Sequence, residues 1–374
     1  MNVSDFAKSN IKKLIPYRNY ILFESSPDFS DNTLCVFQEM VNRDLHRKYQ
    51  FIWMQNFKNS TVPDWFPKNI KCVHRHSKLG RFYRNTAKYM ISCNDFLASI
   101  RDGQYSLFLN HGTALKTTSE FYVLPEHMTQ VLAASDESNK LTARYFKYDK
   151  SKSIVLGFPR NDVFAQSPRN LTPFFGNYSK VISWYPTYRH RTNGFGSASA
   201  NELPLLYSEE NAVALNNKLI KDNVLIIIKP HPAQDVSRIK KWNLSNILLI
   251  NDDFFRRNQI SSYEFLNACD AMITDYSSVY YDYLLCNKPI GAVWEDIEEY
   301  LQFPGLIDNY EYYMGGAEKI YTIEDMIGFV ERVAKEEDVL YEKRNQLKLL
   351  MNYSDDGQNT KRVVDYIETV LNNK

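Results

Sequence analysis

The sequence predicts an α/β protein made of two Rossmann-like domains, each built around a parallel sheet. The chain has 374 residues, which is enough for two domains of ordinary size. Short apolar runs typical of strands alternate with longer helical patterns, and this alternation indicates parallel strands joined by helices. A stretch rich in Pro, Gly and Asn at 161–178 divides the alternation into two series and is typical of a linker.

The first series begins with the apolar run ILFE directly after Tyr20, and Asp31 and Asn32 can cap the helix that follows it. That helix is expected to continue to about Arg47, and a second one covers 79–87. The expected strands of this series are 21–24, 50–55, 69–73, 88–92, 105–110, 129–134 and 152–156.

The second series repeats the pattern and ends in three helices. Its expected strands are 180–185, 223–229, 246–250, 271–274 and 289–294. Its expected helices are 208–221, 234–242, 262–269, 279–285, 323–336, 339–351 and 359–371. We therefore expect one domain over 1–165, a second over 175–345, and C-terminal helices over 346–374 that could pack back across the domains.

Composition excludes several classes of protein. The net charge of +1 argues against a nucleic-acid binder that relies on phosphate contacts. No apolar run approaches the roughly 18 to 20 residues that span a bilayer, and no secretory signal is apparent. The 5 cysteines are scattered and form no CxxC pair, which favours reduced thiols in a cytoplasmic protein.

The first 19 residues combine basic and apolar side chains. Lys8, Lys12, Lys13 and Arg18 surround apolar positions in this short amphipathic segment. Such a segment could rest on an anionic membrane surface, or it could be a plain N-terminal helix packed on its domain.

The strand AMIT at 271–274 leads into a polar turn that opens a helix. Asp275, Ser277 and Ser278 form this turn together with Tyr276. The free N–H groups at the start of a helix, with its dipole, attract a phosphate, and the two serine hydroxyls could add hydrogen bonds. The alternative is an ordinary serine cap after a strand.

Three further polar clusters follow apolar strands. They are His111-Gly112-Thr113 after YSLFLN, Pro186-Thr187-Tyr188-Arg189 after KVISWY, and Pro230-His231-Pro232 after NVLIIIK. In open α/β sheets the ligand lies at the carboxyl ends of the strands. The four clusters therefore indicate one site assembled from separate loops.

In this order, the four clusters resemble the CDP-glycerol glycerophosphotransferase family, which includes teichoic acid and capsule polymerases. The resemblance extends from YRNYILFESSPDFSDN near residue 20 to about Tyr300, and includes GFPRND at 157–162. It implies a GT-B fold, in which two Rossmann-like domains face a central cleft. The N-terminal domain would then hold the acceptor and the C-terminal domain the nucleotide donor.

The family pattern HGT followed by a basic residue, here Lys116, implies that His111 is a general base, with Gly112 and Thr113 beside it. A neutral imidazole can take the proton of an attacking hydroxyl. Spacing alone leaves open a structural histidine bonded to a nearby carbonyl. The resemblance places His231 at the donor phosphates, although a strand exit with an incidental histidine is the alternative.

The remaining candidates would hold the donor. Arg189 and Lys229 are the cations expected at the pyrophosphate, where phosphoryl transfer needs charge neutralisation. Arg160 is a second cation there, unless it forms a structural ion pair with Asp162. The other candidates are Thr274, Ser277 and Ser278 for phosphates, Asp282 for an alditol or ribose hydroxyl unless it is a surface carboxylate, Asp275 for orienting the loop, and Thr187 beside Arg189.

No HExxH metal motif and no GxGxxG, GxxxxGK[ST] or GxSxG pattern occurs, which disfavours nicotinamide, P-loop and serine-hydrolase chemistry. No cofactor and no metal ligands are therefore expected, and the sequence leaves open whether a divalent cation is required. The family resemblance implies transfer of an alditol phosphate from CDP-glycerol or CDP-ribitol to a polymer or its lipid-linked primer. A lipid-linked acceptor implies a peripheral position at the inner membrane face. The alternatives are a glycosyltransferase that uses a nucleotide sugar and a silent scaffold, and the presence of both His111 and His231 argues against the scaffold.

Overall fold

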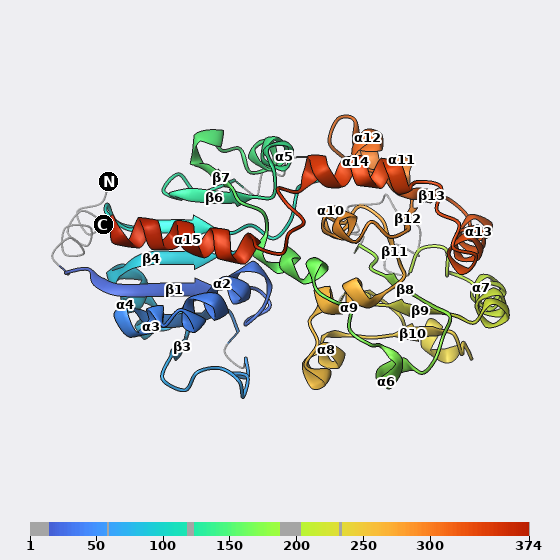
Figure 1. The fold of residues 1–374 in the computed structure, drawn as a ribbon, viewed down its shortest axis with the longest axis horizontal. Helices are drawn as coiled ribbons and strands as arrows, with labels where there is room; N and C mark the ends of the chain where they lie inside the picture. Colours follow the sequence, from blue (N-terminus) through green and yellow to red (C-terminus); the bar gives the residue numbers. More distant parts are fainter. Residues whose placement is uncertain (1–14, 58–59, 118–122, 188–202, 232–233, 374) are drawn as a thin grey trace. The chain divides into compact units, whose positions relative to one another are not determined.

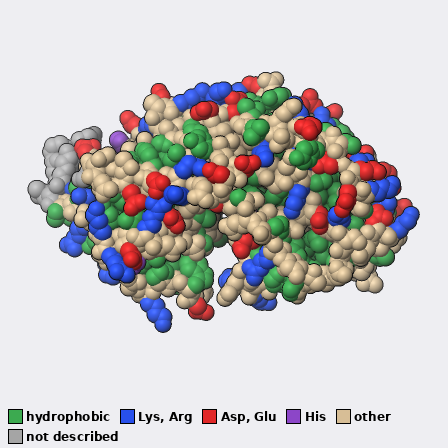
Figure 2. Space-filling view, viewed as in Figure 1, with side chains coloured by type: hydrophobic (Ala, Val, Ile, Leu, Met, Phe, Trp, Pro, Cys, Tyr) green, Lys and Arg blue, Asp and Glu red, His purple; other side chains and the backbone are tan. Residues whose placement is uncertain are grey.

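The computed structural model describes residues 15–57, 60–117, 123–187, 203–231 and 234–373. The chain forms two compact units, which are described separately below. The first unit contains 1–113, 118–162 and 356–374, and the second contains 114–117 and 163–355. The C-terminal helix thus belongs to the first unit. Lys, Arg, Asp and Glu side chains are interspersed over the face seen in Figure 2, as the near-zero net charge suggests.

The first unit contains a seven-stranded parallel sheet in the order β3-β2-β1-β4-β5-β6-β7 (Figure 1). Its strands are rich in β-branched and aromatic residues, which suit a pleated surface. They are β1 (Arg18–Glu24), β2 (Gln50–Gln55), β3 (Lys71–His74), β4 (Ala87–Ser92), β5 (Tyr105–Phe108), β6 (Gln130–Ala133) and β7 (Ser153–Val155).

Helices cover both faces of this sheet. Because side chains alternate along a strand, Ile21 and Phe23 face α2 (Asp31–Asn42) and the C-terminal α15 (Asn359–Asn372). Figure 1 shows α15 lying along the sheet, and an ion pair of 2.6 Å joins Arg43, just after α2, to Glu368. On the opposite face, Leu22 packs with Tyr83 of α4 (Lys78–Thr86). The same face is covered further along by α5 (Asp136–Phe146), while α3 (Leu45–Lys48) precedes β2.

The second unit contains a six-stranded parallel sheet in the order β10-β9-β8-β11-β12-β13. Its strands are β8 (Lys180–Trp184), β9 (Val224–Ile228), β10 (Ile247–Leu249), β11 (Ala271–Thr274), β12 (Ile290–Val293) and β13 (Glu318–Ile320). Strand β9 reads VLIII and is buried along its whole length, as expected for a strand with both faces covered.

Two hydrophobic clusters cover the faces of this second sheet. On one face, Trp184, Ile226 and Ile273 pack against α7 (Glu209–Asp222) and α13 (Ile323–Ala334). On the other, Leu225 and Ile227 pack against α8 (Asp252–Asn258) and α9 (Ser262–Ala268), together with residues of α6 (Thr172–Phe175). The remaining helices of this unit are α10 (Val279–Tyr283), α11 (Ile297–Gln302), α12 (Tyr310–Tyr313) and α14 (Tyr341–Met351).

In each parallel sheet the order in which successive strands are added reverses once, between β1 and β4 in the first unit and between β8 and β11 in the second. This strand order is that of doubly wound nucleotide-binding folds, which place ligands where the order reverses. The prediction of two Rossmann-like parallel-sheet domains of GT-B type is therefore confirmed. The domain limits drawn from the sequence stay a prediction.

One predicted helix is wrong. Of the expected helix at 234–242, the described residues form only the 3₁₀ turn η3 (Ile239–Lys241). Val236, Ile239 and Trp242 nevertheless contact the core, so their three-residue spacing reflects burial of an irregular segment and not a helix. The sequence prediction also missed the helices α5, α6, α8, α11 and α12 and the edge strand β13.

The candidate membrane segment at 1–19 lies mostly outside the described residues. Within the parts of the chain that the structure describes, no helix is both long and apolar enough to cross a bilayer. The same described ranges contain no group of three or more His, Cys, Asp or Glu side chains arranged to hold a metal ion.

Candidate functional site

In the first unit, His111 lies in the loop directly after β5. The loop reverses at Asn110, with φ 60°, and at Gly112, with φ 148°, a region that favours glycine. The ring Nδ1 lies 3.3 Å from the carbonyl oxygen of Cys93, which follows β4. Because a carbonyl only accepts hydrogen bonds, Nδ1 carries the hydrogen and Nε2 is the basic nitrogen. The histidine side chain is exposed.

Buried polar contacts hold the His111 loop in place. The Asn110 side chain accepts the His111 backbone N–H at 2.8 Å. Asn32, fully buried near the start of α2, donates to the Asn110 carbonyl at 2.8 Å. Thr113 is also buried, and its hydroxyl lies 2.6 Å from that of Ser138 in α5. Contacts from two helices, α2 and α5, therefore fix this loop.

Arg160 belongs to this support and not to an ion pair with Asp162. Its guanidinium is buried and contacts Asp31 at 2.7 Å, and its backbone N–H donates to Asn32 at 3.0 Å. Asp162 instead accepts the backbone N–H groups of Asn359 and Thr360 at 2.8 Å each, at the start of α15. The alternative of an Arg160–Asp162 pair is therefore wrong, and Arg160 instead contacts Asn32, which bonds to the His111 loop.

Lys116 follows His111 closely in sequence but lies in the second unit. The segment 114–117 pairs there with 304–307 through an antiparallel bridge between Lys116 and Leu306. The ammonium lies 5.9 Å from the ring centre of Tyr300, which stacks on Tyr276 with a centroid separation of 3.7 Å. Lys116 is thus placed beside the predicted 275–278 turn.

That turn meets the exit of β8 at the point where the second sheet reverses. The carboxylate of Asp275 is fully buried and accepts the backbone N–H of Thr187 at 2.8 Å and that of Tyr276 at 2.6 Å. The Thr187 hydroxyl also donates to it. Asp275 therefore ties two loops together.

The other hydroxyls of this turn differ in exposure. Thr274 is fully buried and donates to the Tyr185 carbonyl at 2.9 Å, so its hydroxyl is used between strands. Ser277 and Ser278 are half-buried. Ser278 occupies the cap position of α10 without a side-chain cap bond, and Ser277 accepts the Val279 N–H at 3.4 Å. Of these three residues, the two serines are the ones with partly exposed side chains.

Asp282 is not a surface carboxylate. Its side chain is 2% exposed and accepts a hydrogen bond of 3.0 Å from the Tyr263 hydroxyl of α9. That alternative is therefore wrong, and a hydroxyl ligand would have to share the carboxylate with Tyr263.

Lys229 and His231 follow β9, the neighbour of β8. The Lys229 ammonium pairs with Asp252 at 3.0 Å and is 19% exposed. His231 is exposed, and its backbone N–H donates to the Gln234 side chain at 2.8 Å. Since neighbouring strands lie about 4.8 Å apart, the exits of β9, β8 and β11 span roughly 10 Å. Arg189 lies outside the described residues.

Two buried or bonded carboxylates at strand ends were missed by sequence reasoning. Glu295 follows β12 and accepts the Leu205 N–H at 2.9 Å and the Tyr207 hydroxyl. Glu24 ends β1 and is fully buried. Both directly follow apolar runs, PIGAVW and ILF, which is the signal that identified the other clusters.

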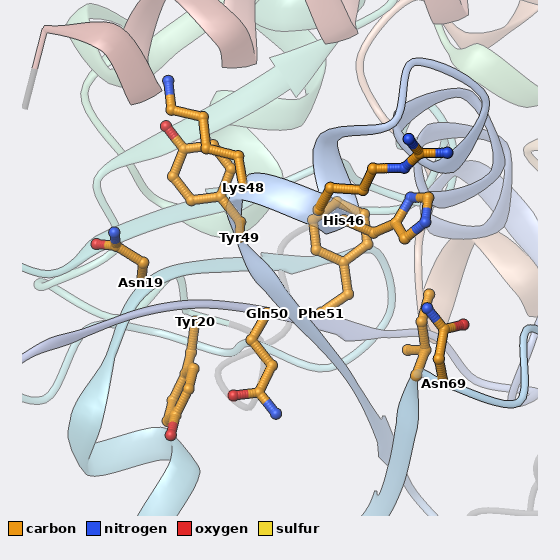
Figure 3. A pocket seen from close by; sticks show the side chains of 10 residues that line it. Asn19, Tyr20, His46, Lys48, Tyr49, Gln50, Phe51 and Asn69 are labelled. Atoms are coloured by element: carbon orange, nitrogen blue, oxygen red, sulfur yellow. The ribbon is translucent and has the colours of Figure 1, made fainter.

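The first unit also contains an open pocket of about 360 Å³, and Figure 3 shows the side chains that line it. It is lined by the starts of β1 and β2 and by the basic residues His46, Arg47 and Lys48 of α3. This is the amino-end edge of the sheet, opposite the edge that binds ligands in doubly wound folds. The pocket is therefore separate from the candidate site.

Comparisons with known proteins identify the family of the chain. The family model described as CDP-Glycerol:Poly(glycerophosphate) glycerophosphotransferase matches residues 7–369. A teichoic acid poly(glycerol phosphate) polymerase of Bacillus spizizenii is 25% identical over 77% of this chain and 75% of its own length. A teichoic acid poly(ribitol-phosphate) polymerase of the same organism is 29% identical over 64% of this chain, and the match spans 37% of that longer protein.

Solved structures show the same fold. The wall teichoic acid polymerase TagF superposes with a TM-score of 0.76 at 19% identity, covering 98% of this chain and 93% of that one. The Staphylococcus aureus MnaA structure with UDP has a TM-score of 0.55 at 13% identity, covering 94% of this chain and 96% of that one. At these identities the likeness concerns the fold alone.

Proposed function

We propose that this chain, which belongs to the CDP-glycerol:poly(glycerophosphate) glycerophosphotransferase family, transfers an alditol phosphate from a CDP-alditol to a hydroxyl acceptor. The acceptor is a teichoic-acid-like or capsule polymer or its lipid-linked primer. The observation that carries this proposal is the family match over nearly the whole chain, which includes both histidine loops.

The first unit would activate the acceptor. His111 Nε2 takes the hydroxyl proton while the oxygen attacks the β-phosphorus of the donor. The new P–O bond joins the acceptor to the alditol phosphate, and the bond from the β-phosphorus to the bridging oxygen breaks, so that CMP leaves with that oxygen. Nδ1 stays bonded to the Cys93 carbonyl, which holds the ring in the tautomer that the reaction needs.

The second unit would hold the donor. Phosphoryl transfer depends mainly on positioning and on neutralising charge at the phosphates. Lys229 supplies a point charge, His231 a hydrogen bond or proton, and Ser277 and Ser278 supply hydroxyls, with Arg189 as a further cation. Asp275 and Thr274 shape the turn, and Asp282 offers its carboxylate to an alditol or ribose hydroxyl.

A lipid-linked acceptor would bring the protein to a membrane surface. We therefore propose peripheral contact with the inner face of the cell membrane, for which the basic segment before β1 is the candidate. Co-sedimentation with vesicles containing anionic lipid tests this. If a variant with Lys8, Lys12 and Lys13 changed to Gln binds the vesicles as well as the wild type does, the proposed membrane contact is contradicted.

Release of CMP by purified protein tests the reaction. The donors are CDP-glycerol, CDP-ribitol and several nucleotide sugars, each with and without a polymer or primer acceptor. Acceptor-dependent CMP release is expected from one CDP-alditol and should fall by about 10³-fold in His111→Ala, because a general base contributes about 10² to 10⁴. The matched control is His127→Ala, which changes another histidine of the first unit.

Other results of this assay would redirect the proposal. Turnover of a nucleotide sugar together with silence toward both CDP-alditols would leave a glycosyltransferase. Equal CMP release by the wild type and by His111→Ala would remove the histidine from the reaction while keeping the reaction class.

A further inference from the structure

The proposed reaction does not use Glu24, the carboxyl group that ends β1. Its side chain is fully buried beside the point where the first sheet reverses. One oxygen, Oε1, accepts a hydrogen bond of 2.5 Å from the Asn56 side chain. The other, Oε2, has no hydrogen-bond partner among the residues that the structure describes. A buried, unpaired carboxyl oxygen is costly, so it calls for an explanation.

Glu24 lies within a polar cluster assembled from four strand exits. Asn56 follows β2 and accepts a bond of 2.6 Å from Arg75, which follows β3. Arg75 also pairs with Asp95, which follows β4. The Arg75 guanidinium remains 3.9 Å from Glu24, too far for a hydrogen bond. The cluster thus leaves the Glu24 carboxyl incompletely satisfied despite a nearby cation.

The charge of the cluster indicates what it can bind. Arg75 is the one cation among the described residues named for this cluster, whereas Asp95 and Asp28 are acidic, and Asp28 accepts the Asn56 backbone N–H at 3.0 Å. The pKa of Glu24 is raised to about 7, mainly by burial and to a smaller extent by the charge of Asp95. The hydrogen bonds from the Asn56 side chain and the Asp95 backbone N–H and the charge of Arg75 act in the opposite direction and lower it. Near neutral pH the cluster carries net negative charge, which disfavours a phosphate and favours neutral hydroxyl groups.

An exposed aromatic side chain adjoins the cluster. Phe57 follows Asn56 directly and is 59% exposed, and its backbone N–H lies 3.5 Å from Asp28. A large apolar face beside hydrogen-bonding groups suits a ligand that presents both C–H and O–H groups. Alditols and sugars have this character.

The cluster also connects to the His111 loop. Ser26, two residues after Glu24, donates to the Asn94 side chain at 3.0 Å, and the neighbouring Cys93 carbonyl contacts His111. The strand order β1-β4-β5 places two strand spacings, roughly 10 Å, between the exits that carry Glu24 and His111. Glu24 would therefore serve a part of the acceptor away from its reacting hydroxyl.

We propose that Glu24, Asn56, Arg75 and Phe57 form an acceptor subsite for a neutral polyhydroxyl unit next to the reacting end. The proposal rests on the proposed function for the identity of the acceptor. The unit is either an alditol of the growing polymer or a sugar of the lipid-linked primer. The Glu24 carboxyl takes up one hydroxyl, directly or through a bridging water, and Phe57 covers the C–H face.

Calorimetric binding tests this subsite without depending on turnover. The two probes are a glycerol-phosphate trimer and a soluble disaccharide that carries one glycerol phosphate. The wild type should bind at least one of them. Phe57→Ala and Glu24→Gln should each weaken that binding about tenfold, and the probe that is affected identifies the source of the hydroxyl groups.

Controls separate this subsite from general damage. Tyr341→Ala removes a similarly exposed aromatic ring from the second unit and should leave binding unchanged. Phe57 is mostly exposed, so its variant should fold normally even if Glu24→Gln does not. Wild-type affinity for both probes in Phe57→Ala and in a folded Glu24→Gln, or no binding of either probe to the wild type, would overturn the proposal. Intact binding without CMP release would instead count against the proposed reaction.

Discussion

Each unit places one fully buried carboxyl group beside the point where its sheet reverses, and the two groups are satisfied very differently. Asp275 at the end of β11 accepts two backbone N–H groups and one hydroxyl. Glu24 at the end of β1 accepts one side-chain amide and leaves Oε2 unpaired among the described residues. A carboxylate whose oxygens all accept hydrogen bonds from the protein holds the surrounding loops in place. A carboxyl group with an oxygen that lacks a hydrogen-bond partner can still take up a proton or a hydrogen bond from a ligand.

The largest effect is expected from Asp275→Asn, which removes the carboxylate that bonds the β8 and β11 loops together. The new amide would present its NH₂ toward donors that now point at the carboxylate. Loss of charge-assisted bonds in a buried place should cost roughly 3 kcal/mol of unfolding free energy, and the β8 and β11 loops should separate. Urea unfolding and CMP release measure the two consequences.

The control for this change is Asp253→Asn, which alters a half-exposed carboxylate of the same unit. It should shift the unfolding free energy by less than about 1 kcal/mol. Comparable stability losses in the two variants would show that Asp275 is not the tie between the loops.

Glu24→Gln sharpens the other side of the comparison through its pH dependence. Burial raises the pKa of Glu24 to about 7 from an ordinary value of 4.5. The protonated carboxyl therefore contributes stability that is fully present below about pH 4.5 and is lost as the pH rises through 7. Relative to Glu24→Gln, the wild type should lose up to about 3 kcal/mol between pH 4.5 and pH 8.

Unfolding in urea at several pH values measures this difference. Glu39→Gln, which changes a half-buried glutamate on α2, is the matched control and should follow the wild-type profile apart from a constant offset. Parallel curves for the wild type and Glu24→Gln would mean that the Glu24 carboxyl does not change its protonation in this range.

The same contrast explains how much could be predicted from sequence. The strand β2 occupies the predicted residues 50–55, because an apolar, aromatic run between polar residues has few other stable arrangements. The loops of the candidate site were also expected at strand exits, where the structure has them, because they directly follow such runs. The bonding of their side chains was not, because it depends on tertiary partners: Thr187 and Asp275 lie 88 residues apart, and Glu24 and Asn56 lie 32 apart.

Apolar periodicity failed to predict secondary structure where buried residues do not form a helix. Val236, Ile239 and Trp242 have helical spacing and reach the core, yet their segment forms only a short 3₁₀ turn. Helix α5 shows the converse, because its polar start DESNK lacks an apolar pattern and yet is helical. Ser135 caps this helix by accepting the Ser138 N–H at 3.0 Å. Capping residues therefore deserve weight beside apolar spacing.

The smallest stability change is expected from Lys229→Met. This variant tests whether the strand exits of the second unit bind the donor through a positive charge. Lys229 pairs with Asp252, whose carboxylate is 57% exposed, so the pair contributes less than about 1 kcal/mol. If the ammonium binds a donor phosphate, the KM for the CDP-alditol should rise about tenfold while the acceptor KM stays unchanged. Lys218→Met breaks a similarly placed pair with Asp222 on α7, away from the strand exits, and should leave both KM values unchanged. Equal donor KM values in the two variants would mean that Lys229 only forms its ion pair and does not bind the donor. Binding of the donor phosphates would then depend on the Ser277 and Ser278 hydroxyls and on His231.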